Sequence, residues 1–328
     1  MPTRVTRTGK APSAARTLRT QHFLSILDLT AGELADVLAT AQLLKKERGR
    51  GPRGFGATAL AGQHVALLFE KPSLRTRCTF EIAVRELGGD VIAPPQDVAM
   101  GEREPIADVA RNLERWVSGV VIRTFAQERL VEFAAAAPRL HVVNALTDEE
   151  HPCQALADLL TLQEHLGDVK GHTVAFVGDG NNVATSLAQG ALMLGMHVNL
   201  AAPEGYEFRE EIEAQLRGLA RHGATLTTWR DAAQAVAGVA AVYTDAWTSM
   251  GQEAEAQQRR KVFAPFQVNE ALMDAAGDAV FMHCLPAHRG EEATDGVMDG
   301  PASIIFEQAE NRLHAQKALL MRLMGRAQ

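Results

Sequence analysis

The sequence predicts an α/β fold with two doubly wound parallel-sheet domains joined by interdomain helices. Three observations lead to this prediction. Short apolar runs alternate with amphipathic helical stretches along the chain. The same alternation restarts after a long helical stretch at about 152–166. The chain has 328 residues and is 46% hydrophobic, which is enough for two buried cores at about 100–200 residues per domain.

The elements of the first half each have a local signal. Thr30–Glu33 has the pattern of a capping box and opens a helix that ends in the glycine-rich stretch 49–54. A strand, a short loop and a helix follow at about 63–88. The remaining elements are strands at 90–92, 119–122 and 140–143 and helices at about 105–116 and 127–137, with an exposed loop at 96–105.

The second half repeats this pattern. Its expected strands are 173–177, 197–200, 224–226, 239–243 and 280–282. The C-terminal helix, at about 307–324, has an apolar stripe that must dock against other elements. We therefore expect a basic, flexible tail at 1–20, one domain formed by 21–145 plus 305–328, and a second domain formed by 146–304.

Composition narrows the class of protein. The net charge of −7 argues against nucleic acid or a membrane surface as partner. Three scattered cysteines indicate a reducing compartment, and no apolar stretch reaches the ~18 residues of a membrane span, so a cytoplasmic protein is expected. Residues 1–27 are basic and lack acids, as in a transit peptide, but they have no amphipathic repeat, which favours a loosely held tail.

The segment Ser73–Arg77 combines two hydroxyls and two guanidinium groups at the start of a predicted helix. The first N–H groups of a helix have no internal partner and carry the positive end of its dipole. Arginine forks and hydroxyls at that place suit a phosphate dianion. Ser73 could instead simply cap the helix, but a cap needs only one hydroxyl. Anion binding is therefore the favoured interpretation.

Two further segments follow predicted strands of the first half. Arg123 comes at the carboxyl end of an apolar strand, where ligands collect in open α/β sheets, and could reach the same anion as Arg75. His151–Gln154 opens the long helix at 152–166. Pro152 is natural at the first helical position, whereas His151 is a poor cap. The residues alone leave His151 undecided between a structural and a functional role.

The segment Gly178–Val183 lies between a strand and a helix and suggests dinucleotide binding. Val183 replaces the third glycine of that motif, however, and the next strand ends in Ala201–Pro203 instead of the expected acid, with Glu204 nearby. A nicotinamide-dependent oxidoreductase therefore stays only an alternative. The favoured interpretation is that Asn182 offers its amide to a small ligand.

Two more segments with candidate site residues lie in the second half of the chain. Asp245 follows a strand and is placed to hold a cationic amine, although a helix-capping role is equally open. His283 and Cys284 suggest zinc, with His151 and Cys153 as further ligands. Adjacent residues of an extended chain point to opposite sides, so His283 and Cys284 should not chelate together. A thiol that contacts a ligand or handles a proton fits better.

From about residue 21 onward the chain resembles the aspartate/ornithine carbamoyltransferase family. Five segments occur in that family's order, namely Ser73–Arg77, His151–Gln154, Gly178–Asn182, Asp245–Gly251 and His283–Gly290. The sequences Ser-Met-Gly at 249–251 and His-Cys-Leu-Pro at 283–286 favour the ornithine branch. The resemblance implies homotrimers with the active site near a subunit boundary, no metal and no organic cofactor.

The resemblance also implies site residues. Carbamoyl phosphate would be bound by Ser73, Leu74, Arg75, Thr76, Arg123, His151, Gln154, Cys284, Leu285 and Arg312. L-Ornithine would be bound by Asn182, Asp245, Ser249 and Met250, and the catalytic set would be Arg123, His151, Asp245 and Cys284. Two positions depart from the family: Leu74 stands where Thr is common, and the loop Asp97–Glu104 has Ala99 and Met100 where some relatives offer a polar side chain to a neighbouring subunit.

The implied reaction transfers the carbamoyl group of carbamoyl phosphate to the δ-amine of L-ornithine and releases citrulline and phosphate, in arginine biosynthesis or in the reverse, catabolic direction. A sister enzyme that uses putrescine or an N-acylornithine is the nearest alternative, and Asp245 and Ser249 speak for a free α-amino group. A further alternative is a non-catalytic relative, and the intact motif residues argue against it.

Overall fold

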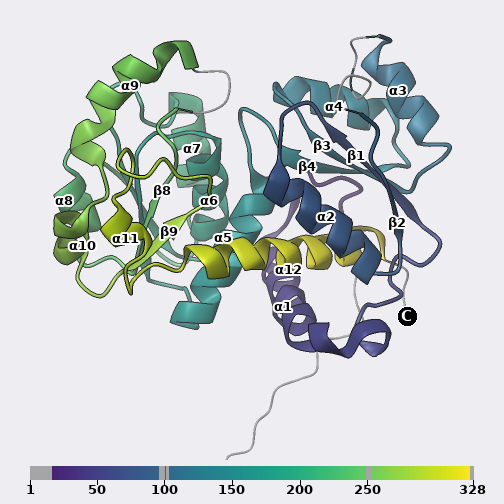
Figure 1. Ribbon diagram of the computed structural model, residues 1–328, viewed down its shortest axis with the longest axis horizontal. Helices are drawn as coiled ribbons and strands as arrows, with labels where there is room; N and C mark the ends of the chain where they lie inside the picture. Colours follow the sequence, from purple (N-terminus) through teal and green to yellow (C-terminus); the bar gives the residue numbers. More distant parts are fainter. Residues whose placement is uncertain (1–16, 96–99, 101–102, 249–252, 326–328) are drawn as a thin grey trace, which may run out of the picture.

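The computed structural model describes residues 17–95, 100, 103–248 and 253–325. It consists of two lobes side by side, each built on a parallel sheet (Figure 1). The first sheet has the strand order β2-β1-β3-β4, and the second has the order β7-β6-β5-β8-β9. All pairings within both sheets are parallel, so the predicted fold class is confirmed.

The first sheet and its helices come from the first half of the chain. The helix α1 begins after Thr30, whose side chain forms the predicted capping box with Glu33. The strands are β1 His64–Phe69, β2 Asp90–Ile92, β3 Gly119–Arg123 and β4 His141–Leu146. The helices are α1 Ala31–Glu47, α2 Leu74–Glu86, α3 Ile106–Leu113 and α4 Gln127–Ala136, with short 3-10 turns at Ile26–Asp28 and Arg48–Arg53.

The second sheet follows the connecting helix α5, Pro152–Leu166. Its strands are β5 Thr173–Val177, β6 His197–Ala201, β7 Leu226–Trp229, β8 Ala241–Thr244 and β9 Val280–His283. Its helices are α6 Asn182–Met193, α7 Glu210–Leu219, α8 Ala232–Val236, α9 Ala256–Phe263, α10 Glu270–Ala276 and α11 Asp295–Met298, with 3-10 turns at Glu253–Glu255 and Ala264–Phe266.

The last helix, α12 (Ile305–Met324), runs horizontally from one lobe to the other in Figure 1, with α1 below it. It packs against α5, α1 and α2. Its apolar stripe is docked as expected, because Leu319 and Leu320 are completely buried, and each buried leucine contributes about 1.5–3 kcal/mol. The largest apolar core accordingly contains residues of α1, α5, α6 and α12 and spans both lobes.

Most predicted elements lie where the sequence placed them, with shifted ends, and three of the differences are described here. Arg123 is the final residue of β3 instead of the first one after it. The strand β7 extends from Leu226 to Trp229, because its threonines and tryptophan suit an edge strand paired with β6. Met100, expected in an exposed loop, is buried; most other residues of that loop lie outside the described part of the chain.

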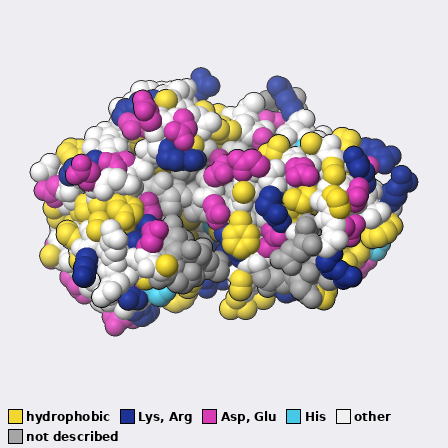
Figure 2. All heavy atoms as spheres, turned by 90° about the horizontal axis from the view of Figure 1, so that it is seen from above, with side chains coloured by type: hydrophobic (Ala, Val, Ile, Leu, Met, Phe, Trp, Pro, Cys, Tyr) yellow, Lys and Arg dark blue, Asp and Glu magenta, His cyan; other side chains and the backbone are white. Residues whose placement is uncertain are grey.

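Three further features concern the N-terminal segment, the charges on one face of the molecule and the length of the helices. Leu18 is buried, and its backbone N–H donates to the carbonyl of Arg322 on α12. On the face shown in Figure 2, acidic and basic side chains are interspersed. Within the described residues, every helix is too short or too polar to span a bilayer.

Candidate active site

The carboxyl ends of the two sheets border one cleft of about 1050 Å³. Eleven of the predicted site residues line this cleft: Ser73, Leu74, Arg75, Thr76, Arg123, His151, Asn182, Asp245, Cys284, Leu285 and Arg312. Gln154 does not line it, and Ser249 and Met250 lie outside the described residues. Residues from both halves of the chain therefore meet in one place, as expected from strand order and parallel pairing.

The anion segment begins helix α2, with Ser73 at the N-cap position. The Ser73 side chain makes no capping hydrogen bond, so a purely structural capping role lacks support. Thr76 is buried in the first turn, and its hydroxyl accepts a hydrogen bond from Nη2 of Arg312 at 2.7 Å. Leu74 is 74% exposed, so its side chain does not pack into the protein at the helix start.

Three arginines border this end of the cleft: Arg75, Arg123 and Arg312. Burial, together with the neighbouring charges of Arg312 and Arg75, lowers the pKa of Arg123 to about 10. Burial also lowers the pKa of Arg312 and of Arg75. Clustered cations of this kind repel one another unless an anion lies between them.

Within the described part of the chain, none of Arg75, Arg123 and Arg312 has an ion-paired carboxylate; the charge of Asp158 acts on Arg312 without direct contact. The buried Nε atoms of Arg123 and Arg312 lack a hydrogen-bond partner within the same part of the chain. Buried donors are normally satisfied, so these atoms indicate a position for a ligand that carries negative charge.

Gln154 lies behind the cleft and contacts it through Arg312. It is buried on α5, where its Oε1 accepts a hydrogen bond from Nη1 of Arg312 at 2.6 Å. Its Nε2 donates to Asp158 Oδ1 at 2.8 Å. The structure therefore places Gln154 one residue further from the cleft than the resemblance implied, as a support for Arg312.

His151 occupies the N-cap position of α5 and is buried. Its backbone N–H donates to Ser186 Oγ at 2.9 Å, and its Nδ1 atom has no partner among the described residues. Burial and the positive charges of Arg312 and Arg123 hold the pKa of His151 well below its ordinary value. A neutral imidazole in the cleft can donate one hydrogen bond to a carbonyl oxygen without bringing a full charge.

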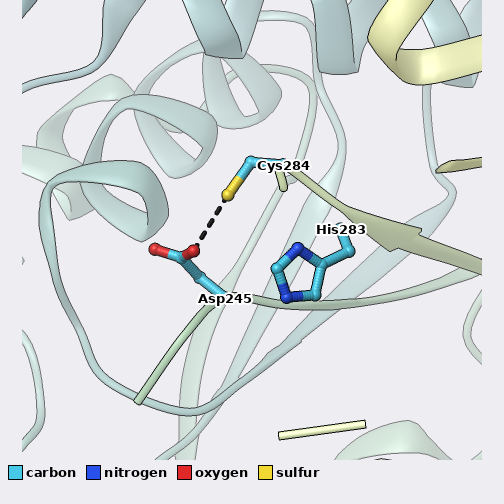
Figure 3. Close-up of side chains that lie close together, drawn as sticks. All are labelled: Asp245, His283 and Cys284. Carbon is cyan, nitrogen blue, oxygen red and sulfur yellow. Dashed lines mark hydrogen bonds between the residues drawn. The ribbon is translucent and has the colours of Figure 1, made fainter. Parts of the chain in front are cut away.

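Asp245 and Cys284 line the same cleft and point toward each other (Figure 3). The Cys284 thiol donates to Asp245 Oδ1 at 2.9 Å. The same oxygen accepts the Ala246 N–H at 2.8 Å, and Asp245 Oδ2 accepts from Asn181 Nδ2 at 2.9 Å. Burial and the Asp245 charge hold the pKa of Cys284 well above its ordinary value, so the thiol keeps its proton at neutral pH.

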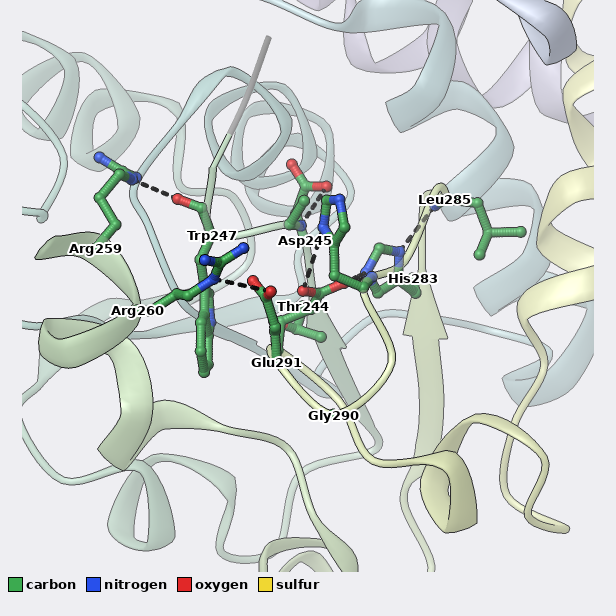
Figure 4. Close-up of polar contacts among 12 residues, drawn as sticks. Thr244, Asp245, Trp247, Arg259, Arg260, His283, Leu285, Gly290 and Glu291 are labelled. Carbon is green, nitrogen blue, oxygen red and sulfur yellow. Dashed lines mark hydrogen bonds and ion pairs between the residues drawn. The ribbon is translucent and has the colours of Figure 1, made fainter. Parts of the chain in front are cut away.

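The expectation that His283 and Cys284 point to opposite sides is wrong. Ligand atoms of Asp245, His283 and Cys284 lie within 4.8 Å of one another. The strand β9 ends at His283, so Cys284 lies just beyond it and the alternation of an extended strand does not apply to this pair. His283 is nevertheless fully engaged: Nδ1 accepts the Leu285 N–H at 2.8 Å (Figure 4), and Nε2 lies 3.1 Å from Glu292 Oε1.

The segment around Gly180 has a structural explanation that needs no dinucleotide. A Cβ at Gly180 would lie 2.7 Å from backbone atoms of Glu207 and Phe208, so only glycine allows this approach. Asn181 caps α6 through the N–H groups of residues 183 and 184. Asn182 lines the cleft, and its Nδ2 donates to the carbonyl of Thr147 at 2.6 Å.

Some lining residues were missed from the sequence. Lys71 lies two residues after the end of β1 and pairs with Asp148 at 2.5 Å, with its Nζ 4.4 Å from the ring centre of Phe125. Its position after a strand was a usable signal. Arg260 and Glu291 also line the cleft and form an ion pair at 2.9 Å (Figure 4), but neither position follows a strand, so no local pattern marks them.

An α/β protein of two parallel-sheet lobes, with a cationic end and a carboxylate–thiol end in one cleft, is suited to bring an anionic donor and an amine together. Comparison with known proteins agrees. Residues 21–164 match the family model described as aspartate/ornithine carbamoyltransferase, carbamoyl-P binding domain, and residues 170–323 match that of the Asp/Orn binding domain. The chain belongs to the aspartate/ornithine carbamoyltransferase family, whose members are transferases of carbamoyl groups.

Individual proteins similar to this chain are also named as carbamoyltransferases or transcarbamylases. The ornithine carbamoyltransferase of Anoxybacillus flavithermus is 48% identical over 310 residues, 94% of this chain and 98% of that protein. The solved ornithine carbamoyltransferase of Pyrococcus furiosus has a TM-score of 0.87 at 44% identity, covering 95% of this chain and 97% of that one. An acetylornithine transcarbamylase complexed with acetylcitrulline has a TM-score of 0.83 at 34% identity, covering 93% and 99%.

Proposed function

We propose that this chain is an ornithine carbamoyltransferase: it transfers the carbamoyl group of carbamoyl phosphate to the δ-amine of L-ornithine and releases L-citrulline and phosphate. The observation that carries the proposal is the charge arrangement of the cleft. Three guanidinium groups without a carboxylate partner among the described residues face Asp245 and Cys284. The curated relatives at 46–48% identity are named ornithine carbamoyltransferase.

The phosphate of the donor is assigned to the first turn of α2. Ser73, Arg75 and Thr76 hold it, with Arg312 from the last helix. The N–H groups at a helix start and arginine forks stabilise a dianion, and they neutralise the charge that phosphate gains as it leaves. Arg123 and the neutral His151 donate to the carbonyl oxygen as negative charge develops on it.

The acceptor must lose a proton before it attacks. An alkylammonium has a pKa of about 10.4, so about one molecule in 2,500 is nucleophilic at pH 7, and recovering that fraction is worth roughly 4–5 kcal/mol. Asp245 accepts the thiol hydrogen bond of Cys284 and so orients the thiol beside the attacking amine. We assign to Cys284, in its protonated form, the selection of the neutral amine, and closure of the lobes then excludes water.

Further residues are assigned to the acceptor amine. Asn182 on α6 is assigned to L-ornithine together with Asp245, Ser249 and Met250, while Leu285 and Cys284 lie at the reacting centre. A free α-amino group gives Asp245 a cationic partner, which an acylated ornithine lacks. This difference is the basis for preferring L-ornithine over an N-acylornithine. Putrescine keeps a second free amine and lacks only the α-carboxylate, so the assay below is what separates it from ornithine.

The decisive test is one assay of carbamoyl phosphate with four amines in parallel: L-ornithine, N-acetylornithine, putrescine and aspartate. We expect citrulline and phosphate with ornithine and slow or no turnover with the others. Phosphate release with another amine but not with ornithine would overturn the proposal. A Cys284→Ala variant that keeps the full kcat across the neutral pH range would remove the role given to the thiol.

Four broader expectations belong with this function: the assembly, the compartment, the metabolic role and the domain division. We propose a homotrimer that works in the cytoplasm in arginine metabolism, as the family resemblance and the absence of a candidate membrane span among the described helices suggest. We also propose the domain division 21–145 plus 305–328 and 146–304. Sedimentation equilibrium tests the assembly, since a stable monomer at micromolar concentration would contradict it.

A further inference from the structure

Two pairs of polar side chains face each other across the helices α5 and α12, behind the cleft. Gln154 and Asp158 are four residues apart on α5, and Gln308 and Arg312 are four residues apart on α12, so each pair lies on one helix face. Arg312 contacts Gln154 at 2.6 Å, and Gln308 contacts Asp158 at 2.7 Å. All four residues are buried.

Asp158 lies at the centre of this set. Its Oδ1 accepts hydrogen bonds from Nε2 of Gln154 at 2.8 Å and from Nε2 of Gln308 at 2.7 Å. Its Oδ2 accepts from the Tyr243 hydroxyl at 3.1 Å. The two glutamines reach outward in opposite directions, because Oε1 of Gln154 accepts from Arg312 and Oε1 of Gln308 accepts the backbone N–H of His283 at 2.9 Å.

The donors and acceptors leave only one direction for these hydrogen bonds. Arg312 and the His283 N–H can only donate, and an ionised Asp158 can only accept. Each glutamine must therefore turn Oε1 outward and Nε2 toward Asp158. A reversed amide would place its NH₂ group against the guanidinium of Arg312 or against a backbone N–H, leaving buried donors unpaired.

We propose that Asp158 is a positioning residue for both halves of the cleft. Through Gln154 it orients Arg312 at the phosphate end, and through Gln308 it holds the backbone of His283 and so places Cys284 at the amine end. Asp158 itself touches neither ligand, since it does not line the cleft. The inference rests on the proposed function only for the names of the two ligands.

The main test compares three variants of the full chain by calorimetric binding of inorganic phosphate and by steady-state kinetics. Asp158→Leu removes the shared acceptor, and we expect phosphate binding to weaken by about 10-fold or more, with a matching rise in the KM for carbamoyl phosphate. Asp158→Asn should restore the wild-type affinity, because Asn Oδ1 accepts from both glutamines while its Nδ2 donates to the Tyr243 oxygen. Tyr243→Phe is the control, since it leaves both contacts at Asp158 Oδ1 intact.

A second pair of variants separates the two ends and serves if Asp158→Leu fails to fold. Gln154→Leu should weaken phosphate binding, whereas Gln308→Leu should leave it unchanged and instead raise the KM for ornithine or lower kcat. Wild-type phosphate affinity in folded Asp158→Leu would overturn the proposal, as would equal loss in Asp158→Asn and Asp158→Leu, or equal effects of the two glutamine variants on phosphate.

These outcomes are distinguishable from a failure of the proposed function. Phosphate binding needs no acceptor amine, so its response to the Asp158 variants can be measured even if ornithine is not turned over. If the wild type fails to use ornithine while phosphate binding still follows the predicted order, the function is wrong and the positioning role at the phosphate end stands.

Discussion

Nη2 of Arg312 donates a hydrogen bond to Oγ1 of Thr76, 2.7 Å away and 236 positions earlier in the chain. This contact connects the last helix of the protein to the first turn of α2, where the anion is assigned. Arg312 lies on the side of α12 that packs against α5, where it also contacts Gln154, and this packing places its guanidinium beside the start of α2. A helix far away in sequence thus completes the phosphate end of the cleft.

The Thr76 contact can be tested with an isosteric change. Thr76→Val removes the hydroxyl that accepts from Arg312, and we expect the KM for carbamoyl phosphate to rise by about 10-fold while the KM for ornithine changes little. Thr79→Val on the same helix is the matched control, because the Thr79 hydroxyl donates only to carbonyl groups of its own helix, at 2.7 Å for Arg75. Equal KM values in the two variants would contradict this assignment.

The protonation of Cys284 predicts slow alkylation. Burial and the Asp245 charge raise its pKa, so iodoacetamide should label Cys284 more slowly than the exposed Cys78 at mildly alkaline pH. Asp245→Asn removes the negative charge and should accelerate labelling of Cys284 but not of Cys78. Peptide mass spectrometry over time measures both sites in one sample. Unchanged Cys284 labelling in that variant would contradict the proposed coupling.

The close packing at Gly180 predicts that a substitution by alanine lowers the free energy of unfolding. Gly180→Ala places a Cβ 2.7 Å from the backbone of Glu207 and Phe208, and we expect a loss of about 1–3 kcal/mol in the free energy of unfolding. Gly218→Ala on α7 is the control, because a Cβ there meets nothing within 4 Å and should stabilise the helix by up to about 1 kcal/mol. Urea unfolding of both variants gives the comparison, and equal signs would refute the packing argument.

The raised pKa of Asp158 predicts that the free energy of unfolding depends on pH. Burial raises its pKa from 3.8 to about 6, although hydrogen bonds from Gln154, Gln308 and Tyr243 oppose the rise. Because the folded state binds the proton more tightly, this carboxyl stabilises the fold below pH 3.8, and the contribution is lost as pH rises toward about 6, a difference of about 3 kcal/mol at neutral pH.

Asp158→Asn lacks this titration. From about pH 4.5 to about pH 7, the stability of the variant should therefore increase relative to wild type in urea unfolding. Asp274→Asn on α10 is the control, since Asp274 is exposed. A constant difference between Asp158→Asn and wild type across this range would show that Asp158 does not take up a proton on folding.

Local sequence signals were sufficient for most elements. The capping box at Thr30 and Glu33 and the proline that opens α5 are interactions among residues close in sequence, so their pattern is visible in the chain. The same holds for Ser73, Arg75 and Thr76, which share one helix turn. Strand ends also marked Arg123, Asp245 and Cys284, because parallel strands bring their carboxyl ends to one edge.

Contacts between distant residues could not be predicted in this way. The convergence of Asp245 with His283 and Cys284 depends on the pairing of β8 with β9, which brings together residues 39 positions apart in the chain. Lys71 and Asp148 are 77 positions apart, and their pairing required β1 and β4 to lie in the same sheet.

By itself, the sequence determined the two-lobed α/β fold and the chemical types that gather at its strand ends, because hydrophobic periodicity, caps and turns act over a few residues. Only the tertiary structure decided which side chains touch the cleft and which support it. It moved Gln154 behind Arg312 and showed Asp158 and Gln308 at the centre of the support. The physical reason is that buried polar groups must be paired, and their partners here come from helices about 150 positions apart, brought together only by packing.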